Sequence, residues 1–387
     1  MPLLLKKPCA RWAARTWKAG GWMRRIILLI SGLLIAQVWL WGGVRRVRVP
    51  AYGVSPDAVV TPSGEVYVVF ARSQNAYLAI SKDNGNTFFD PVQLNRAPRS
   101  VVGGHERGPK IALGGGATVH IVWMSARSDE LLYTHGDPDT GDFSPPRNLL
   151  DAKTHLDGAT VAADQQGNVF VAWLDARQPK DRLNPLSLPV FWTESQDAGQ
   201  TFSKNQTSTA LRACSCCALK AMAGSEGGFD LAFRGGYNNI RDMFLARFTA
   251  SENGLLPAIG KIHDDNWEFN ACPMSGPSLA RSTKPPVVWA AWMSRGRAYF
   301  SESPDEGQQF QAPRTPRARR SASQNHPLVL LNSQGQVLLA WEEGASIRWQ
   351  LADPTGEIFQ SGNAGTLPQG SKAAGYVDRE GNFCLVF

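Results

Sequence analysis

The sequence lacks the short motifs that identify several large enzyme classes. It has no glycine-rich phosphate loop, no Gly-x-Gly-x-x-Gly dinucleotide fingerprint, no His-Glu-x-x-His and no Gly-x-Ser-x-Gly. In the enzymes that carry them, these motifs supply the phosphate cradle, the cofactor turn, the zinc ligands and the nucleophile. Their absence argues against a kinase, a dinucleotide-dependent enzyme and a standard zinc protease.

Acidic residues are missing from the first 48 residues, which contain ten Lys and Arg side chains. The whole chain of 387 residues has a formal charge of +7, but residues 49–387 carry 30 basic and 33 acidic side chains. A general nucleic-acid-binding domain needs a basic face to neutralise phosphates. The charge distribution therefore predicts no nucleic-acid partner for residues 49–387.

Residues 26–43 contain no charged side chain and are flanked by Arg24–Arg25 and Arg45–Arg46. The run is near the lower limit for crossing a hydrocarbon core of roughly 30 Å. Basic residues concentrate before it, which places the N-terminus in the cytoplasm. We expect a basic cytoplasmic segment at 1–25, a single transmembrane anchor at 26–43, and a domain at 44–387 that is periplasmic or extracellular. A cleaved signal peptide is the alternative, although no small-x-small site follows the run.

Residues 44–387 also lack a long helical pattern, and they repeat instead. A short apolar strand that ends in an aromatic residue recurs at intervals of 46 to 60 residues. A period of this length is typical of a repeat architecture built from one small sheet per repeat. The recurring aromatic residues are Phe70, Trp123, Trp173, Phe233, Trp292, Trp341 and Phe387.

A turn motif accompanies three of the repeats. It reads SKDNGNTF at 81–88, SQDAGQTF at 195–202 and, in weaker form, SPDEGQQF at 303–310. The Ser and Asp side chains can cap backbone N–H groups of the turn, and Gly can adopt a positive φ. We interpret six of these residues as structural: Asp83, Gly85, Asp197, Gly199, Asp305 and Gly307.

The turns resemble the Asp boxes, or BNR repeats, of the sialidase (neuraminidase) superfamily. The resemblance implies an all-β fold, a β-propeller of four-stranded blades around a central channel. Seven strand pairs favour seven blades, whereas six blades, the number in the family's sialidases, is the alternative. The segment 44–52 could complete the last blade by pairing the two ends of the domain.

In a propeller fold, the arginines that flank the inner strands would lie near one end of the central channel, the funnel mouth. Because the loops that enter and leave the inner strands meet at one face, distant residues converge there. Clustered arginines in a slightly acidic domain favour a small anionic ligand, such as an acidic glycan, over a polyanion. The predicted ligand-binding residues are Arg107, Arg127, Arg177, Arg234 and Arg241.

The resemblance also raises exo-α-sialidase activity, a glycoside hydrolase reaction. Retaining sialidases clamp a carboxylate with three arginines, and use a Tyr nucleophile paired with Glu and an Asp acid/base. The candidates here are Tyr237, Asp157 and Glu106. However, the family's early (Phe/Tyr)-Arg-Ile-Pro motif is not clearly present, and no Tyr/Glu pair can be assigned.

Cysteines are few, yet four of the six lie in two short segments, RACSCCALKA and NACPMSGPSLA. This C-x-C-C…C-P pattern is similar to one in a bacterial branch labelled sialidase-like. One interpretation is a disulfide from Cys216 or Cys217 to Cys272. The other is a Cu(I) or Zn(II) site of thiolates and imidazoles. Its candidate ligands are Cys214, Cys216, Cys217, Cys272, His155 and His326, with His105 a further histidine.

Three classes of function follow from these patterns. The first is an anchored, exported propeller that binds a small ligand or a metal at its funnel. The second is an exo-sialidase. The third is a scaffold or assembly factor for a membrane protein complex, which needs neither a clamp nor a metal.

Overall fold

The computed structural model describes residues 43–104, 106–178, 185–224, 227–251, 254–317 and 322–387. The chain divides into two units, Met1–Gly42 and Gly43–Phe387. The predicted cytoplasmic segment, and the predicted anchor up to residue 42, lie outside the described residues. Within the described residues, no helix is long and apolar enough to cross a bilayer.

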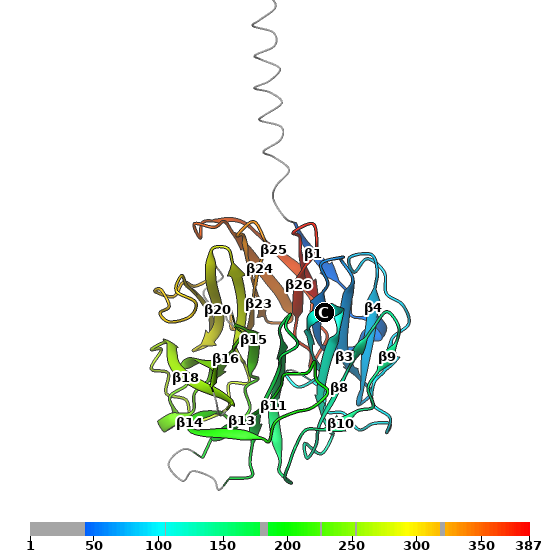
Figure 1. The fold of residues 1–387 in the computed structure, drawn as a ribbon. Coiled ribbons are helices and arrows are strands. Elements are labelled where there is room, and N and C mark those ends of the chain that lie inside the picture. The colour runs from blue at the N-terminus through cyan, green and yellow to red at the C-terminus, as the bar shows by residue number, and fades with distance from the viewer. Residues whose placement is uncertain (1–42, 105, 179–184, 225–226, 252–253, 318–321) are drawn as a thin grey trace, which may run out of the picture. The chain divides into compact units, whose positions relative to one another are not determined.

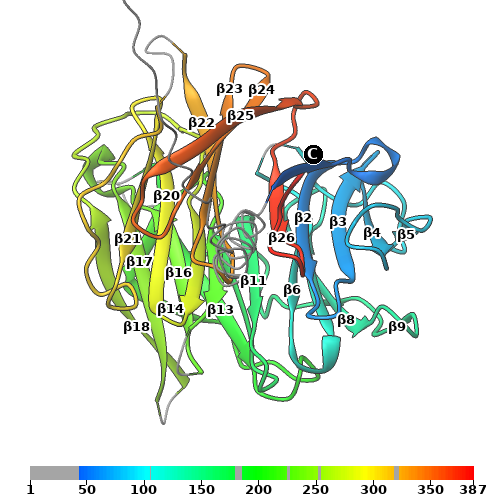
Figure 2. The same cartoon turned by 90° about the horizontal axis from the view of Figure 1, so that it is seen from above.

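The unit Gly43–Phe387 contains seven sheets in its described residues, arranged around a common centre (Figures 1 and 2). The first two sheets in chain order are β2–β5 (Val54–Val60, Val66–Arg72, Asn75–Ser81, Val92–Gln93) and β6–β10 (Lys110–Leu113, Val119–Met124, Leu131–Asp137, Asp142–Phe143, Arg147–Asn148). The next two are β11–β14 (Leu156–Ala163, Val169–Asp175, Ser187–Ser195, Gln206–Cys214) and β15–β18 (Lys220–Ala223, Phe229–Arg234, Met243–Ser251, Gly254–His263).

The remaining three sheets complete the ring. They are β19–β21 (Ser278–Thr283, Pro286–Ser294, Arg297–Ser303), β22–β25 (Gln324–Leu331, Val337–Glu343, Ser346–Ala352, Ile358–Thr366) and a closing sheet of β26 (Ala374–Val377), β27 (Phe383–Val386) and β1 (Val44–Val47).

The second strand of each sheet carries the recurring aromatic residue, or in the closing sheet ends just before it at Val386, and is buried on both faces. In β12, VFVAWLD, all seven residues are buried. Both faces are covered because neighbouring sheets pack against each other face to face, so strict alternation of apolar and polar residues gives way to a continuous apolar run. This explains why the repeat was visible in the sequence as a series of apolar strands.

The first strands form a closed circle around the centre. Each contacts the first strands of its two neighbours, in the order β26, β2, β6, β11, β15, β19, β22 and back to β26. The circle confirms the prediction of seven blades over six. In the described residues, four blades have four strands, β6–β10 has five, and the closing sheet and β19–β21 have three each. In β19–β21 a bridge between Phe300 and Arg314 marks the place of a fourth strand.

The closing sheet joins the two ends of the domain, as the sequence predicted for segment 44–52. Strand β1 pairs in parallel with β27, in the register Val44 with Phe383 to Val47 with Val386. In Figure 2, blue β2 lies beside red β26, so the earliest and latest parts of the domain are neighbours. The seventh blade is therefore built from both ends of the domain.

The three Ser-x-Asp-x-Gly turns share one hydrogen-bond pattern. In the first, the Ser81 hydroxyl donates to Asp83 (2.7 Å) and accepts from the N–H of Gly85 (2.8 Å). The N–H of Thr87 donates to the Asp83 carboxylate (2.8 Å), and Gly85 has a φ of +80°. The turns at Asp197 and Asp305 repeat these bonds. They follow the third strands β4, β13 and β21, and their Asp side chains act in the turn itself.

Candidate functional site

A cavity of about 110 Å³ lies where the first strands converge. Its walls come from the starts of β2, β15, β19, β22 and β26, together with Glu106 before β6. The cavity therefore lies at the hub of the ring and collects residues from far apart in the sequence. Its charged lining residues are Asp57, Glu106, Lys220, His326 and Lys372.

Lys110, the first residue of β6, is buried and does not itself line the cavity, but four lining residues, Asp57, Glu106, Lys220 and Lys372, are close enough to act on its charge. Its Nζ has no hydrogen-bond partner within the described residues. Burial, with the positive charges of Lys372 and Lys220, lowers the pKa of Lys110 to about 7, against the opposing effect of Asp57 and Glu106. A buried amine without a partner costs stability, so an anion in the cavity would stabilise it.

Glu106, a predicted catalytic candidate, instead holds loops together. Its two carboxylate oxygens accept hydrogen bonds from the N–H groups of Ala218 (2.8 Å) and Gly276 (2.5 Å). Burial alone would raise its pKa, but Lys372, His326 and these two N–H groups outweigh burial and lower the pKa of Glu106. Glu106 is thus an ionised carboxylate that connects three blades at the hub.

His326 has both ring nitrogens engaged. Nδ1 lies 2.7 Å from a carboxylate oxygen of Glu342, and Nε2 lies 2.8 Å from the carbonyl oxygen of Met274. Burial lowers its pKa, but the hydrogen bond to Glu342 and the charge of Glu106 prevail and raise the pKa of His326. An imidazolium that donates from both nitrogens fits these partners. A ring with both nitrogens occupied has no lone pair to offer a metal.

Two predicted site residues bind each other. Arg107 donates through Nε to both oxygens of Asp157, at 2.9 Å and 3.1 Å. The Arg107 side chain remains 41% exposed. The Asp157 carboxylate and the Arg107 guanidinium are therefore paired with each other.

Other predicted residues have separate surroundings. Arg177 pairs with Asp175 and Asp151 and lies over the ring of Phe191. Arg127 is exposed and lines a separate surface pocket with Arg99 and Lys153. Tyr237 donates a hydrogen bond to the carbonyl oxygen of Ala210 (3.0 Å). The described structure therefore does not gather the predicted arginines into one clamp around Tyr237.

Arg234 and Arg241 correct the expectation of a funnel-mouth arginine ring, because both are fully buried. Arg234 donates to the carbonyl oxygens of Ser275, Arg241 and Met293, at 2.7 to 2.9 Å for its terminal nitrogens. Arg241 donates through Nε to the carbonyl oxygen of Phe269 (3.0 Å), and its two terminal nitrogens have no partner within the described residues. Both side chains therefore lie in the interior, where backbone carbonyl groups accept their hydrogen bonds.

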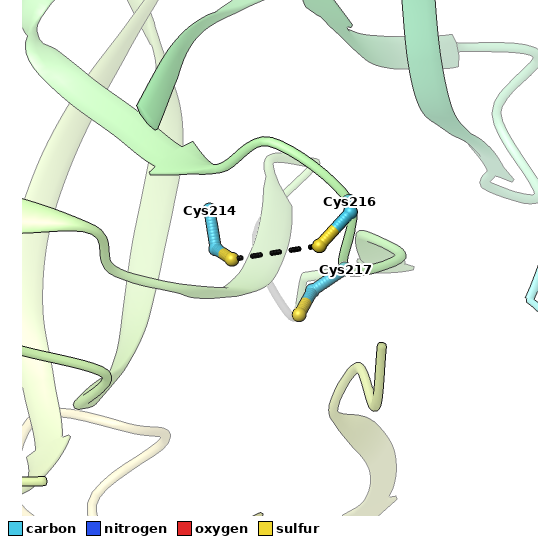
Figure 3. A group of neighbouring side chains, drawn as sticks. All are labelled: Cys214, Cys216 and Cys217. Atoms are coloured by element: carbon cyan, nitrogen blue, oxygen red, sulfur yellow. Dashed lines mark hydrogen bonds between the residues drawn. The ribbon is translucent and has the colours of Figure 1, made fainter. Parts of the chain in front are cut away.

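Four cysteines come together beside these arginines. Cys216 and Cys272 form a disulfide with a Cα–Cα distance of 6.3 Å. Cys214 and Cys217 are buried free thiols. Figure 3 shows the sulfur atoms of Cys214, Cys216 and Cys217 turned toward one another, and all three lie within 4.8 Å of each other. We call these four cysteines with Arg234 and Arg241 the cysteine junction.

The two free thiols differ in acidity. A hydrogen bond from Cys217 and the charges of Arg241 and Arg234 lower the pKa of Cys214 to about 6, although burial acts in the opposite direction. The same hydrogen bond and burial raise the pKa of Cys217. The directions of the two pKa shifts favour Cys214 over Cys217 as the thiolate of the pair.

The histidines predicted as metal ligands do not join this cluster. Among the described residues, the group of sulfur ligands contains no histidine. His155 is exposed at the start of β11, and His105 lies outside the described residues. With Cys216 held in the disulfide, only Cys214 and Cys217 retain thiols at the junction.

Two patterns in the sequence indicate site residues that the prediction based on arginines did not include. A lysine stands at or just before the start of three first strands, in KIAL, KAMA and SKAAGYV. In addition, Cys214 and Cys217 have Cys-x-x-Cys spacing, which is typical of redox pairs. A search restricted to first-strand positions would have found Lys110, Lys220 and Lys372.

Comparisons with known proteins yield structural neighbours only. No protein-family model and no curated protein sequence matches the chain. AofleA from Arthrobotrys oligospora matches with a TM-score of 0.53 and 11% identity, over 82% of this chain and 88% of that one. Penicillium chrysogenum α-L-arabinanase complexed with arabinobiose matches with a TM-score of 0.50 and 10% identity, over 80% and 96%.

A sialidase is also among the neighbours. Hadza microbial sialidase Hz136 has a TM-score of 0.49 and 14% identity, and it covers 80% of this chain. The present chain spans 66% of that sialidase's length. At such identities the similarities to AofleA and the arabinanase show the fold alone, and that fold is the β-propeller.

Proposed function

We propose that this chain is a sialidase-like propeller that binds a small anion in its central cavity, without sialidase catalysis. The observation that carries the proposal is Lys110, a buried amine with no partner within the described residues. Its ammonium interacts with the charges of Lys220 and Lys372, which line the cavity. The positive charges of Lys220 and Lys372 oppose protonation of Lys110 more than Asp57 and Glu106 favour it, and an anion in the cavity would reverse this balance.

The carboxylates nearby are already engaged. Asp57 accepts hydrogen bonds from the N–H groups of Ala58 and Ile111, each at 3.2 Å. Glu106 accepts from Ala218 and Gly276 and faces His326. The cavity of about 110 Å³ accommodates a group of carboxylate or phosphate size. We infer that the ligand is a carboxylate, and that an acidic sugar would insert its acid group between the lysines.

Binding can be measured by calorimetric titration of the full-length protein with acetate, glucuronate and N-acetylneuraminate, and with neutral arabinobiose as the comparison. We expect the acids to bind and the neutral sugar not to bind. Lys372→Met should weaken acid binding by about tenfold or more, because one buried charge contact is lost. The matched control is Lys204→Met, which removes an exposed lysine. Equal binding by both variants would contradict the proposal.

The proposed absence of sialidase catalysis is supported by the pairing of Arg107 with Asp157 and by the burial of Arg234 and Arg241. These contacts occupy the groups that the reaction would need. We expect no release of fluorophore from a 4-methylumbelliferyl sialoside between acidic and neutral pH. Turnover by the folded protein that is lost in Tyr237→Phe would restore the exo-sialidase alternative.

We further propose that the propeller is exported and anchored by residues 26–43. The support is the charge pattern of the sequence, with ten basic residues and no acid in the first 48. Protease added to intact cells with a permeable outer envelope should digest the propeller. Protection of the propeller under these conditions would contradict export.

A further inference from the structure

The cysteine junction places a thiol pair beside a disulfide. Cys214 is the last residue of β14, and Cys216 and Cys217 follow in the turn that leads to β15. The sulfur atom of Cys214 lies 3.9 Å from that of Cys216 (Figure 3). Cys214 and Cys217 are each 1% exposed, whereas Cys272, at the far end of the disulfide, is exposed. A buried thiol pair thus adjoins a disulfide that reaches the surface.

The charge at the junction favours a thiolate. The guanidinium groups of Arg234 and Arg241 stay protonated in any environment, and both are fully buried. Among the described residues, their hydrogen bonds go only to carbonyl groups, and two nitrogens of Arg241 have no partner. Carbonyl dipoles do not neutralise a buried charge, so an anion is needed nearby. The sulfur atom of Cys214, as a thiolate, can supply this negative charge beside Arg234 and Arg241.

The two segments of the junction are held in register by one side chain. Glu106 accepts a hydrogen bond from Ala218, the residue after Cys217, and another from Gly276, in the loop that carries Cys272. This positions the Cys214–Cys217 turn against the Cys272 loop independently of the disulfide. The sulfur atoms therefore remain close when the disulfide opens.

We propose that the junction is a thiol–disulfide relay, which passes reducing equivalents between the buried Cys214–Cys217 pair and the exposed Cys216–Cys272 pair. Its external reactant is a disulfide or thiol that reaches Cys272 from solvent. The inference is independent of anion binding in the central cavity.

The relay needs no added oxidant, because the Cys216–Cys272 disulfide accepts the two electrons that Cys214 and Cys217 lose. The Cys214 thiolate attacks the sulfur of Cys216, a Cys214–Cys216 bond forms, and Cys272 leaves as a thiolate. Cys217 then attacks Cys214, which releases Cys216, and the proton of Cys217 passes to one of the two freed thiolates. The net change oxidises Cys214 and Cys217 to a disulfide and reduces Cys216 and Cys272 to one thiol and one thiolate. The Cys272 thiolate then attacks an external disulfide and releases one external thiolate, and Cys216 attacks the resulting mixed disulfide at Cys272, which releases the second external thiolate and forms the Cys216–Cys272 disulfide again.

The test uses the full-length chain in detergent without added oxidant or reductant. Iodoacetamide traps free thiols, and peptide mapping by mass spectrometry identifies the labelled cysteines and the disulfides. In Cys217→Ser the second step is blocked, so a Cys214–Cys216 disulfide should accumulate with Cys272 labelled. In Cys214→Ser the first step is blocked, and labelling of Cys272 should slow by about tenfold or more relative to the wild type.

Cys384→Ser is the matched control, because Cys384 is a buried free thiol in the closing sheet, away from the junction. It should label like the wild type, and thermal unfolding should show that all three variants are folded. With glutathione disulfide as the probe, Cys272 should form a mixed disulfide in the wild type and not in Cys214→Ser. Equal Cys272 labelling in wild type and Cys214→Ser would overturn the relay, and so would stoichiometric copper or zinc with unreactive thiols.

Discussion

The central cavity and the cysteine junction both bury cations, but they do so with different side chains. At the cavity, Lys110 has no hydrogen-bond partner among the residues that the structure describes, and its pKa is lowered to about 7, so it can lose its proton. At the junction, Arg234 and Arg241 cannot lose theirs, and they are held by carbonyl groups beside a cysteine sulfur. Because a buried lysine can become neutral, its site can exist with or without a bound anion. A buried arginine requires a permanent counter-charge and becomes part of the structure.

The largest effect should come from removing a structural arginine. Arg234→Met should lower the free energy of unfolding by roughly 3 to 5 kcal/mol, because three buried carbonyl groups lose their donor. Chemical denaturation measures the change, with the exposed Arg127→Met as the control that should stay within about 0.5 kcal/mol. An unchanged free energy of unfolding in Arg234→Met would show that the buried arginine, like the buried lysine Lys110, can be removed without loss of stability.

Removing the lysine should have the opposite sign. Lys110→Met should raise the free energy of unfolding of the ligand-free protein by about 1 to 3 kcal/mol, because an unpaired buried amine is replaced by an apolar side chain. The native pKa of Lys110 is lowered to about 7, so above that pH the unfolded chain binds more protons and wild-type stability rises with pH. The gain in the variant should therefore be largest below neutral pH and shrink as pH increases. A loss of stability at all pH values would show that Lys110 has a partner.

His326 sharpens the contrast within the same cavity, since its pKa is raised and not lowered. Its stabilising contribution is fully present below the unfolded pKa of about 6.5 and is lost as pH rises through the folded value. His326→Gln should cost about 1 to 2 kcal/mol in mildly acidic solution and less in alkaline solution. The informative quantity is the pH slope of the difference, since it is opposite in sign to that of Lys110→Met. A cost independent of pH would argue against an imidazolium between Glu106 and Glu342.

The smallest effect is expected at the partly exposed pair of Arg107 and Asp157. Asp157→Asn should change stability by less than about 1 kcal/mol, because solvent screens such pairs. It should also leave acetate binding unchanged. A large loss of binding would move the ligand site from the lysines to this pair.

The fold was predictable because its signal repeats. The apolar strands ending at Phe70, Trp123 and their equivalents recur with one period, and each repeat forms one sheet. The closure through residues 44–52 followed from the incomplete last repeat. The sequence could not show which way Arg234 and Arg241 point, because a long side chain after a strand can reach solvent or the neighbouring loops. That choice depends on carbonyl groups of Ser275 and Phe269, which lie between β18 and β19, about 30 to 40 residues further along the chain.

The closing sheet has a consequence for the order of folding. Strand β27 supplies the centre of that sheet, and its partners β26 and β1 come from opposite ends of the domain. The N–H of Gly43 donates to Asn382, across 339 positions in the chain. Contacts of such separation form slowly, because loop closure costs entropy before the contact returns stability. The ring should therefore close as a late event, and until then β2 and β26 present open faces to which a chaperone or another chain could bind.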